Sequence, residues 1–93
     1  MNRNNIIEIN KIAFVLANES DPSRIEEFFS EMLTESELET ISKRWRIMEM
    51  LYKGHTQREI SKEMKVSLCK VTRGSQILKK QNTIIREYIQ KGQ

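Results

Sequence analysis

The stretch "HTQREISKEMKVSLCKVTRGSQILKK" (residues 55–80) predicts two short helices with a tight bend between them, and it is the most informative part of the sequence about the fold. Thr56 and Glu59 form a capping box, in which each side chain satisfies a free amide at the start of a helix. Val66 follows at the bend, and Ser67 is a good N-cap for the second helix. A short helix, a bend and a second helix make up the helix-turn-helix pattern.

Apolar residues on both helices of this stretch are spaced so that they lock the helices together. Ser61 is small, as is needed where the two helices cross. Two packed helices that present only a solvated polar surface would show the same spacing, so this alternative stays open. The residues expected to form the contact are Ile60, Met64, Val66 and Val71.

The second helix of a helix-turn-helix lies in the major groove of DNA. We therefore expect its first turns to face base edges and nearby cationic side chains to meet phosphate. Expected near the base edges are Leu68, Cys69, Lys70 and Thr72, with Arg58 beside them. Expected at phosphates are Arg58, Lys62, Lys79 and Lys80, and Gln57 completes the set of candidate DNA-binding residues.

The rest of the chain also predicts helices. An apolar stripe with spacings of three and four residues covers residues 6–16. Asp21 followed by Pro22 is typical of an N-cap with proline at the first helical position. Asn82 or Thr83 is expected to cap a last helix. The sequence therefore predicts an all-α protein of six helices, with short connections and no strand.

The longest helix is expected to begin at the capping box of Thr34 and Glu37 and to end near Lys53, with Gly54 as its left-handed stop. Apolar residues cover almost the whole circumference of its second half, which is typical of a buried helix. A chain of 93 residues could hardly surround such a helix. Trp45 is accordingly interpreted as part of a dimer core.

The length of the chain supports the same conclusion. A domain of this size buries only about 60–65% of its unfolded surface, so its own core is marginal. Cys69 is the single cysteine, so no internal disulfide can form. Because oligomerisation is the remaining common remedy, we expect a homodimer.

Charge is distributed unevenly along the chain. Residues 1–42 carry 3 basic and 9 acidic side chains, whereas residues 43–80 carry 11 basic and 3 acidic ones. A basic half beside an acidic half suggests a surface directed at phosphate. Solvated helix faces would give the same distribution, so charge by itself leaves both interpretations open.

Several classes of protein are disfavoured. No apolar run approaches the length of a membrane span, and the first ten residues lack the features of a signal peptide, so a cytoplasmic protein is expected. No Cys/His cluster has the spacing of a metal site. One histidine, no nucleophile–base pair and no phosphate loop argue against an enzyme, and no cofactor is expected.

The motifs "LTESE", "KRWRIMEMLYKGHTQREI" and "VTRGSQILK" resemble the tryptophan operon repressor family over about residues 25–90. The resemblance implies an intertwined all-α dimer that binds operator DNA with L-tryptophan as corepressor. Residues 1–54 would form the dimerisation body, residues 55–80 the helix-turn-helix and residues 81–93 a C-terminal dimerisation helix, all within one domain.

The resemblance also implies a set of residues around the bound amino acid. Arg73 and Gly74 match the arginine along the indole and the glycine that leaves room for it, and Arg44 matches the arginine on the other face. Leu33 and Thr34 match the end of the second helix, which holds the amino group and carboxylate. A plain basic role for Arg44, a phosphate contact for Arg73, close helix packing for Gly74 and simple capping for Thr34 are the alternatives.

The chain departs from the family pattern at several positions. Lys70 stands where the family has a pocket-lining threonine, Ile77 where it has a serine, and Lys65 where it has a glycine. Leu68 and Cys69 differ at the reading tip, so the operator is expected to differ. Two alternatives to a tryptophan-activated repressor therefore stay open. One is a regulator that binds no ligand or a different ligand, and the other is a helical protein-interaction module.

Overall fold

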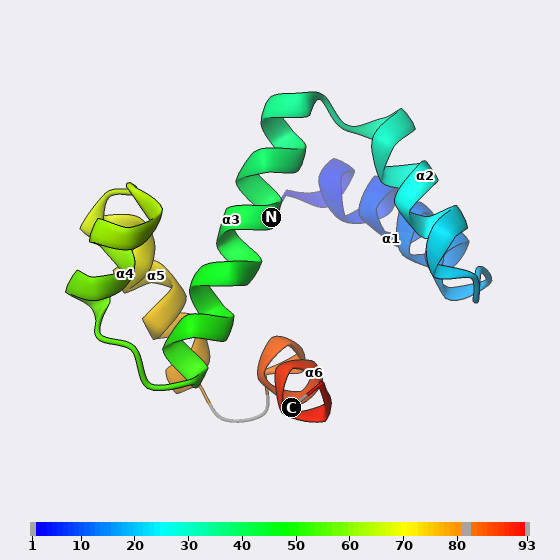
Figure 1. The fold of residues 1–93 in the computed structure, drawn as a ribbon. Coiled ribbons are helices and arrows are strands. Elements are labelled where there is room, and N and C mark those ends of the chain that lie inside the picture. The colour runs from blue at the N-terminus through cyan, green and yellow to red at the C-terminus, as the bar shows by residue number, and fades with distance from the viewer. Residues whose placement is uncertain (1, 81–82, 93) are drawn as a thin grey trace. The chain divides into compact units, whose positions relative to one another are not determined.

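The computed structural model describes residues 2–80 and 83–92, and this part of the chain forms six α-helices and no strand (Figure 1). The prediction of an all-α fold is confirmed. Within the described residues, none of the helices has both the length and the apolar character that a membrane span needs. The helices are α1 (Arg3–Ala17), α2 (Pro22–Met32), α3 (Glu35–Tyr52), α4 (Gln57–Met64), α5 (Leu68–Lys79) and α6 (Ile84–Lys91).

The helices begin where capping side chains occur in the sequence. The Asp21 carboxylate accepts a hydrogen bond from the Ser23 amide at 3.0 Å, with Pro22 at the first helical position of α2. Thr83 caps α6, whereas Asn82, the other candidate for this cap, lies outside the described residues. Besides Thr34, described below, hydroxyls cap the starts of α4, α5 and α6, where Thr56 accepts from the Glu59 amide (3.1 Å), Ser67 from Lys70 (3.4 Å) and Thr83 from Arg86 (3.1 Å).

The predicted bounds of α3 are close to those observed. The Thr34 amide donates to Glu37 Oε1 at 2.8 Å, and the Glu37 amide donates to Thr34 Oγ1 at 3.1 Å, so both bonds of the capping box are present. The helix ends at Tyr52, one residue before the predicted end. Gly54 has φ +99°, which confirms the left-handed stop.

The chain divides into two compact units, Met1–Leu38 and Glu39–Gln93, here called the N-terminal unit and the C-terminal unit. This division follows contacts within one chain. The division predicted from the sequence, at residues 54 and 80, concerns dimerisation and DNA binding and stays a prediction.

The N-terminal unit contains α1 and α2 and has no buried residue among those described. Large apolar side chains are instead exposed along α1, where Phe14 is 72% exposed. An ion pair of 2.7 Å between Arg24 Nε and Glu19 Oε2 joins the start of α2 to the residues that follow α1. The hydrogen bond from Arg24 holds the pKa of Glu19 below its ordinary value.

The C-terminal unit holds the core, which consists of two apolar clusters that each include residues of α3. The first joins α3 to α4 and α5 through Ile47, Met50, Ile60 and Val71. The second joins α3 to α5 and α6 through Met48, Leu78 and Ile89. Both clusters depend on α3, so the second half of this helix is the scaffold on which α4, α5 and α6 are positioned.

The bend between α4 and α5 is made by two local features. Lys65, the C-cap of α4, adopts the left-handed conformation with φ 56° and ψ 46°. The Ser61 hydroxyl donates to the Val66 carbonyl at 2.6 Å, so this small residue also fastens the bend. The family's glycine at the position of Lys65 would adopt such a φ without steric cost.

Candidate nucleic-acid interface and ligand cleft

Helices α4 and α5 pack through the apolar residues that their sequence predicted. Ile60 and Val71 are completely buried, and Met64 and Val66 pack against them. Ile47 and Met50 of α3 belong to the same cluster. The predicted lock is confirmed, and it also attaches the pair of helices to α3.

A hydrogen bond of 2.8 Å runs from the Thr72 hydroxyl of α5 to Gln57 Oε1 at the start of α4. Both residues were predicted to bind DNA, and in the structure their side chains form a hydrogen bond with each other. The bond is partly buried and spans fifteen positions of the sequence. Gln57 and Thr72 therefore fix the rotation of α5 relative to α4, and a direct DNA contact for them stays a prediction.

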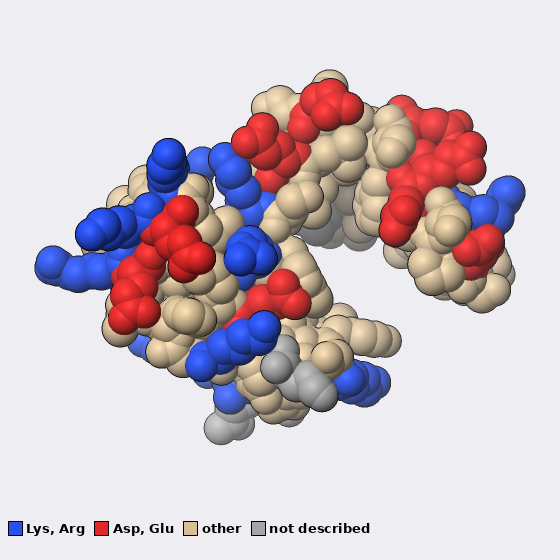
Figure 2. Space-filling model, viewed as in Figure 1, with Lys and Arg blue, Asp and Glu red and all other residues tan. Residues whose placement is uncertain are grey.

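The remaining candidate DNA-binding residues lie on exposed surface of α4 and α5. Leu68 is 45% exposed at the start of α5, and Cys69 beside it is an exposed free thiol. Figure 2 shows Lys and Arg over α4 and α5 with acidic side chains among them, and Asp and Glu over α2 and the start of α3. Among the candidate DNA-binding residues, the exposed cations are Arg58 and Lys62 on α4, Lys70 and Lys79 on α5, and Lys80 at its C-cap.

A cleft of about 160 Å³ opens between α3 and α5 in the C-terminal unit. It brings together Arg44, Arg73 and Gly74, three of the five residues predicted to bind tryptophan. Lys70 and Ile77, which depart from the family pattern, also line it. The cleft therefore contains both the matching residues and the substitutions.

Gly74 is buried where α5 crosses α3. A Cβ at this position would lie 3.2 Å from Ile47 Cγ2, 3.4 Å from Leu51 Cδ1 and 3.5 Å from Met48 Cγ. The first of these is tighter than an ordinary van der Waals contact, so glycine permits the close approach of the two helices. Close packing, the alternative interpretation of Gly74, is thus supported, and Gly74 lines the cleft as well.

Two polar residues of the cleft were not predicted from the sequence. Thr40 and Lys43 line it beside Arg44. They lie seven and four residues before Ile47, which is also in the lining, and this spacing places all of them on one face of α3. The helical period running back from Ile47 places them on this face, but nothing in the sequence alone shows that the face lines a cleft.

Leu33 and Thr34 belong to the N-terminal unit, where Leu33 is the C-cap of α2 and Thr34 precedes α3. The Thr34 hydroxyl accepts a bond from the Glu37 amide, as its capping role requires. A contact of either residue with a ligand in the cleft stays a prediction.

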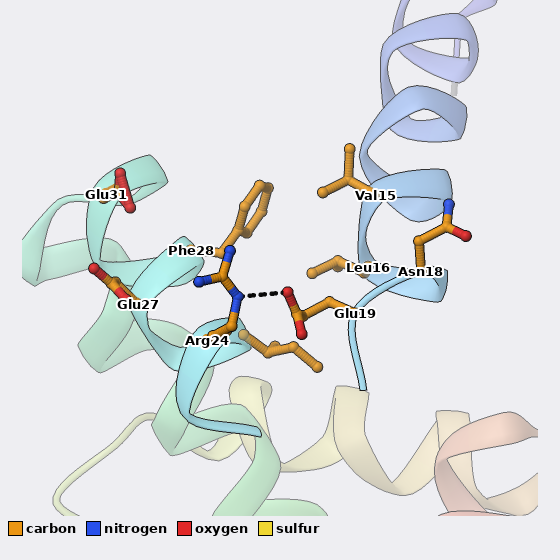
Figure 3. Close-up of a pocket in the computed structure, with 9 residues that line it drawn as sticks. Val15, Leu16, Asn18, Glu19, Arg24, Glu27, Phe28 and Glu31 are labelled. Carbon is orange, nitrogen blue, oxygen red and sulfur yellow. Dashed lines mark hydrogen bonds and ion pairs between the residues drawn. The ribbon is translucent and has the colours of Figure 1, made fainter. Parts of the chain in front are cut away.

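A second cavity, of about 290 Å³, lies within the N-terminal unit between α1 and α2 (Figure 3). Its polar side chains include Glu19 and Arg24, and the dashed line in Figure 3 marks the bond between them. Glu27 and Glu31 lie on the α2 wall. With Arg24 already paired, this cavity presents mainly acidic groups and has none of the features predicted for a tryptophan site.

The part of the chain that the structure describes has no group of three or more His, Cys, Asp or Glu side chains that could hold a metal ion. The arrangement that remains is an exposed basic helix pair, with a cationic and apolar cleft behind its second helix. Such a cleft can bind the apolar part of a small molecule and its anionic group together.

Comparisons with known proteins agree with this arrangement. The family described as Trp repressor protein matches residues 8–93. The chain is 37% identical over 68 residues to the Trp operon repressor homolog of Chlamydia trachomatis serovar D, covering 72% of each chain. The homolog from serovar L2 is 35% identical over the same length and coverage. No solved structure shows a significant match. The chain therefore belongs to the Trp repressor family, a family of transcriptional repressors rather than of enzymes.

Proposed function

We propose that this protein is a dimeric DNA-binding repressor of tryptophan biosynthesis or transport genes, with L-tryptophan as corepressor. The observation that carries the proposal is that α5 supplies both a wall of the cleft and the predicted reading residues. Arg73 and Gly74 lie four and five positions after Cys69 on this helix. A ligand in the cleft therefore touches the reading helix directly and can favour one orientation of it.

Exposed apolar surface supports the dimer. Ile84 and Tyr88 on α6 are 71% and 58% exposed, and Phe14 on α1 is 72% exposed. Trp45, interpreted as dimer core, is 39% exposed in the single chain. Apolar exposure of this kind is typical of a surface that a partner covers.

An electrophoretic mobility shift with a palindromic operator, at one fixed salt concentration, tests the function. We expect millimolar L-tryptophan to increase operator affinity, because a corepressor must bind the DNA-competent state more tightly. Affinity should also fall by several powers of ten between about 50 and 200 mM salt if about 6–10 phosphates are contacted. Operator binding that ignores tryptophan would reject the corepressor, and a flat salt response would favour a protein-interaction module.

Removing the Arg73 side chain distinguishes a role in ligand binding from a role in contacting DNA phosphate. Arg73→Ala should weaken both L-tryptophan binding and operator binding, because the guanidinium can stack on a ring and fork onto a carboxylate. Isothermal titration measures the first effect and the mobility shift the second. Lys53→Ala, which removes an exposed cation outside the cleft and outside α4 and α5, is the matched control. Loss of operator affinity alone would assign Arg73 to phosphate.

A regulator that does without tryptophan is the second candidate. Lys70 and Ile77 line the cleft, where the family has threonine and serine, and their larger side chains leave less room for an indole. Titration of the folded protein with millimolar L-tryptophan distinguishes the candidates, since the absence of heat would favour this one.

A further inference from the structure

The cleft between α3 and α5 is more cationic than one zwitterionic ligand requires. Of the described residues that line it, four are cationic and none is acidic. Lys43 forms an ion pair of 3.0 Å with Glu39, which does not line the cleft. Within residues 2–80 and 83–92, no ion pair engages the three other cations, Arg44, Lys70 and Arg73.

These cations surround an apolar surface. Val66 and Ile77 are half-buried and leave part of this surface accessible, and the nearly buried Ile47 and Met48 of α3, at 2% and 7% exposed, line the cleft beside them. Flat apolar groups gain free energy when they cover such a surface, and arginine stacks on aromatic rings. The cleft therefore suits an aromatic ring with an anionic group beside it.

Lys70 adds a third positive charge to those of Arg44 and Arg73, and it does so from the face of α5 that lines the cleft. It lies three residues before Arg73 and four before Gly74, so the three residues share one face of α5. Arg44 lines the cleft from α3. A ligand on this face thus meets cations from both walls, and an ammonium group on the ligand meets no carboxylate among the described lining residues.

We propose that the cleft takes an aromatic ligand whose head group carries two negative charges, and that Lys70 is the residue that selects for the second charge. The proposal rests on the proposed use of this cleft as the effector site, and it names a further class of ligand for it. An arginine on each wall holds the first charge, and the ammonium of Lys70 holds the second.

Indoxyl phosphate and indoxyl sulfate test the proposal, because they share one ring and a tetrahedral head group but differ in charge. The second pKa of a phosphate ester is about 6, so at pH 7.5 the phosphate is mostly dianionic while the sulfate carries one charge. Isothermal titration of the full chain should give an affinity about tenfold higher for the phosphate, as expected for an added charge-assisted hydrogen bond. Lys70→Met should reduce this ratio to about two or less.

Lys53→Met is the matched control, because it removes one exposed cation outside the cleft and should leave the ratio unchanged. Circular dichroism melts verify that each variant is folded. Equal affinity for the two ligands, an unchanged ratio in Lys70→Met, or no binding of the phosphate would overturn the proposal.

If L-tryptophan still strengthens operator binding in that case, the proposed function stands alone. If the phosphate binds while L-tryptophan has no effect on the operator, the corepressor fails and the charge preference stands.

Discussion

Lys65 carries the steric cost of the bend between α4 and α5. Among the described residues it is the only non-glycine residue with a positive φ, at 56°. A side chain in this conformation costs roughly 1–2 kcal/mol, because its Cβ approaches the following carbonyl oxygen. Glycine avoids that contact but loses more backbone entropy on folding.

We therefore expect Lys65→Gly to raise the free energy of unfolding by about 0.5–1 kcal/mol. Urea denaturation at one fixed protein concentration measures the change. Lys62→Gly, in the interior of α4, is the control and should lower the free energy of unfolding by about 1 kcal/mol. A loss of stability in Lys65→Gly would contradict the left-handed bend.

Gly74 limits how large a residue α5 can carry against α3. Gly74→Val should lower the free energy of unfolding by about 2–3 kcal/mol, because its branched side chain overpacks the contact with Ile47. Thermal denaturation followed by circular dichroism measures the loss. Gly92→Ala is the control, since a Cβ there would meet only ordinary contacts, at 3.6 and 3.7 Å. An unchanged melting temperature in Gly74→Val would show that the helices separate without cost.

At the scale of elements, the pairing of α4 with α5 combines an apolar lock and one polar bond. Thr72→Val keeps the shape of the side chain but leaves Gln57 Oε1 without its donor, and should cost about 1 kcal/mol. Thr72→Ser retains the hydroxyl and serves as the control. A double-mutant cycle with Gln57→Met isolates the bond, and a coupling energy near zero would contradict its role in fixing α5.

The start of α3 is expected to respond to acid. The Thr34 backbone amide, and then its hydroxyl, hold the pKa of Glu37 below its ordinary value. Because the folded pKa is the lower one, the stabilisation is present above the ordinary glutamate pKa and is lost as the pH falls through the folded value. Amides in the first turn of α3 should therefore lose protection on acidification, measured as the exchange rate relative to the intrinsic rate at each pH. Glu37→Gln should remove this pH dependence, and an identical profile in that variant would assign it elsewhere.

At the scale of the whole molecule, the single chain leaves apolar side chains on α1, α3 and α6 exposed. Sedimentation equilibrium should give a dimer at micromolar concentration, with a melting temperature that rises with protein concentration. Ile84→Lys should weaken the dimer, because it places a charge on a surface that we expect to be covered. Lys91→Ala on the same helix is the control. A stable monomer of the unchanged chain would reject the dimeric repressor.

Local sequence patterns were enough to predict where five of the six helices start, where α3 stops, and which residues lock α4 to α5. Caps act over about three residues, so Thr34, Ser67 and Gly54 were readable from local chemistry. The periodicity of apolar residues likewise identified Ile60 and Val71 as the contact between the two helices.

How these elements meet depends on tertiary packing, which local patterns do not record. The close approach of Gly74 to Ile47, the bond between Gln57 and Thr72, and the lining of the cleft by Lys43 all depend on how one helix is rotated against another. That rotation is set by packing between residues far apart in the sequence, which no local pattern records. The same packing brings Lys70 and Arg44 to one cleft.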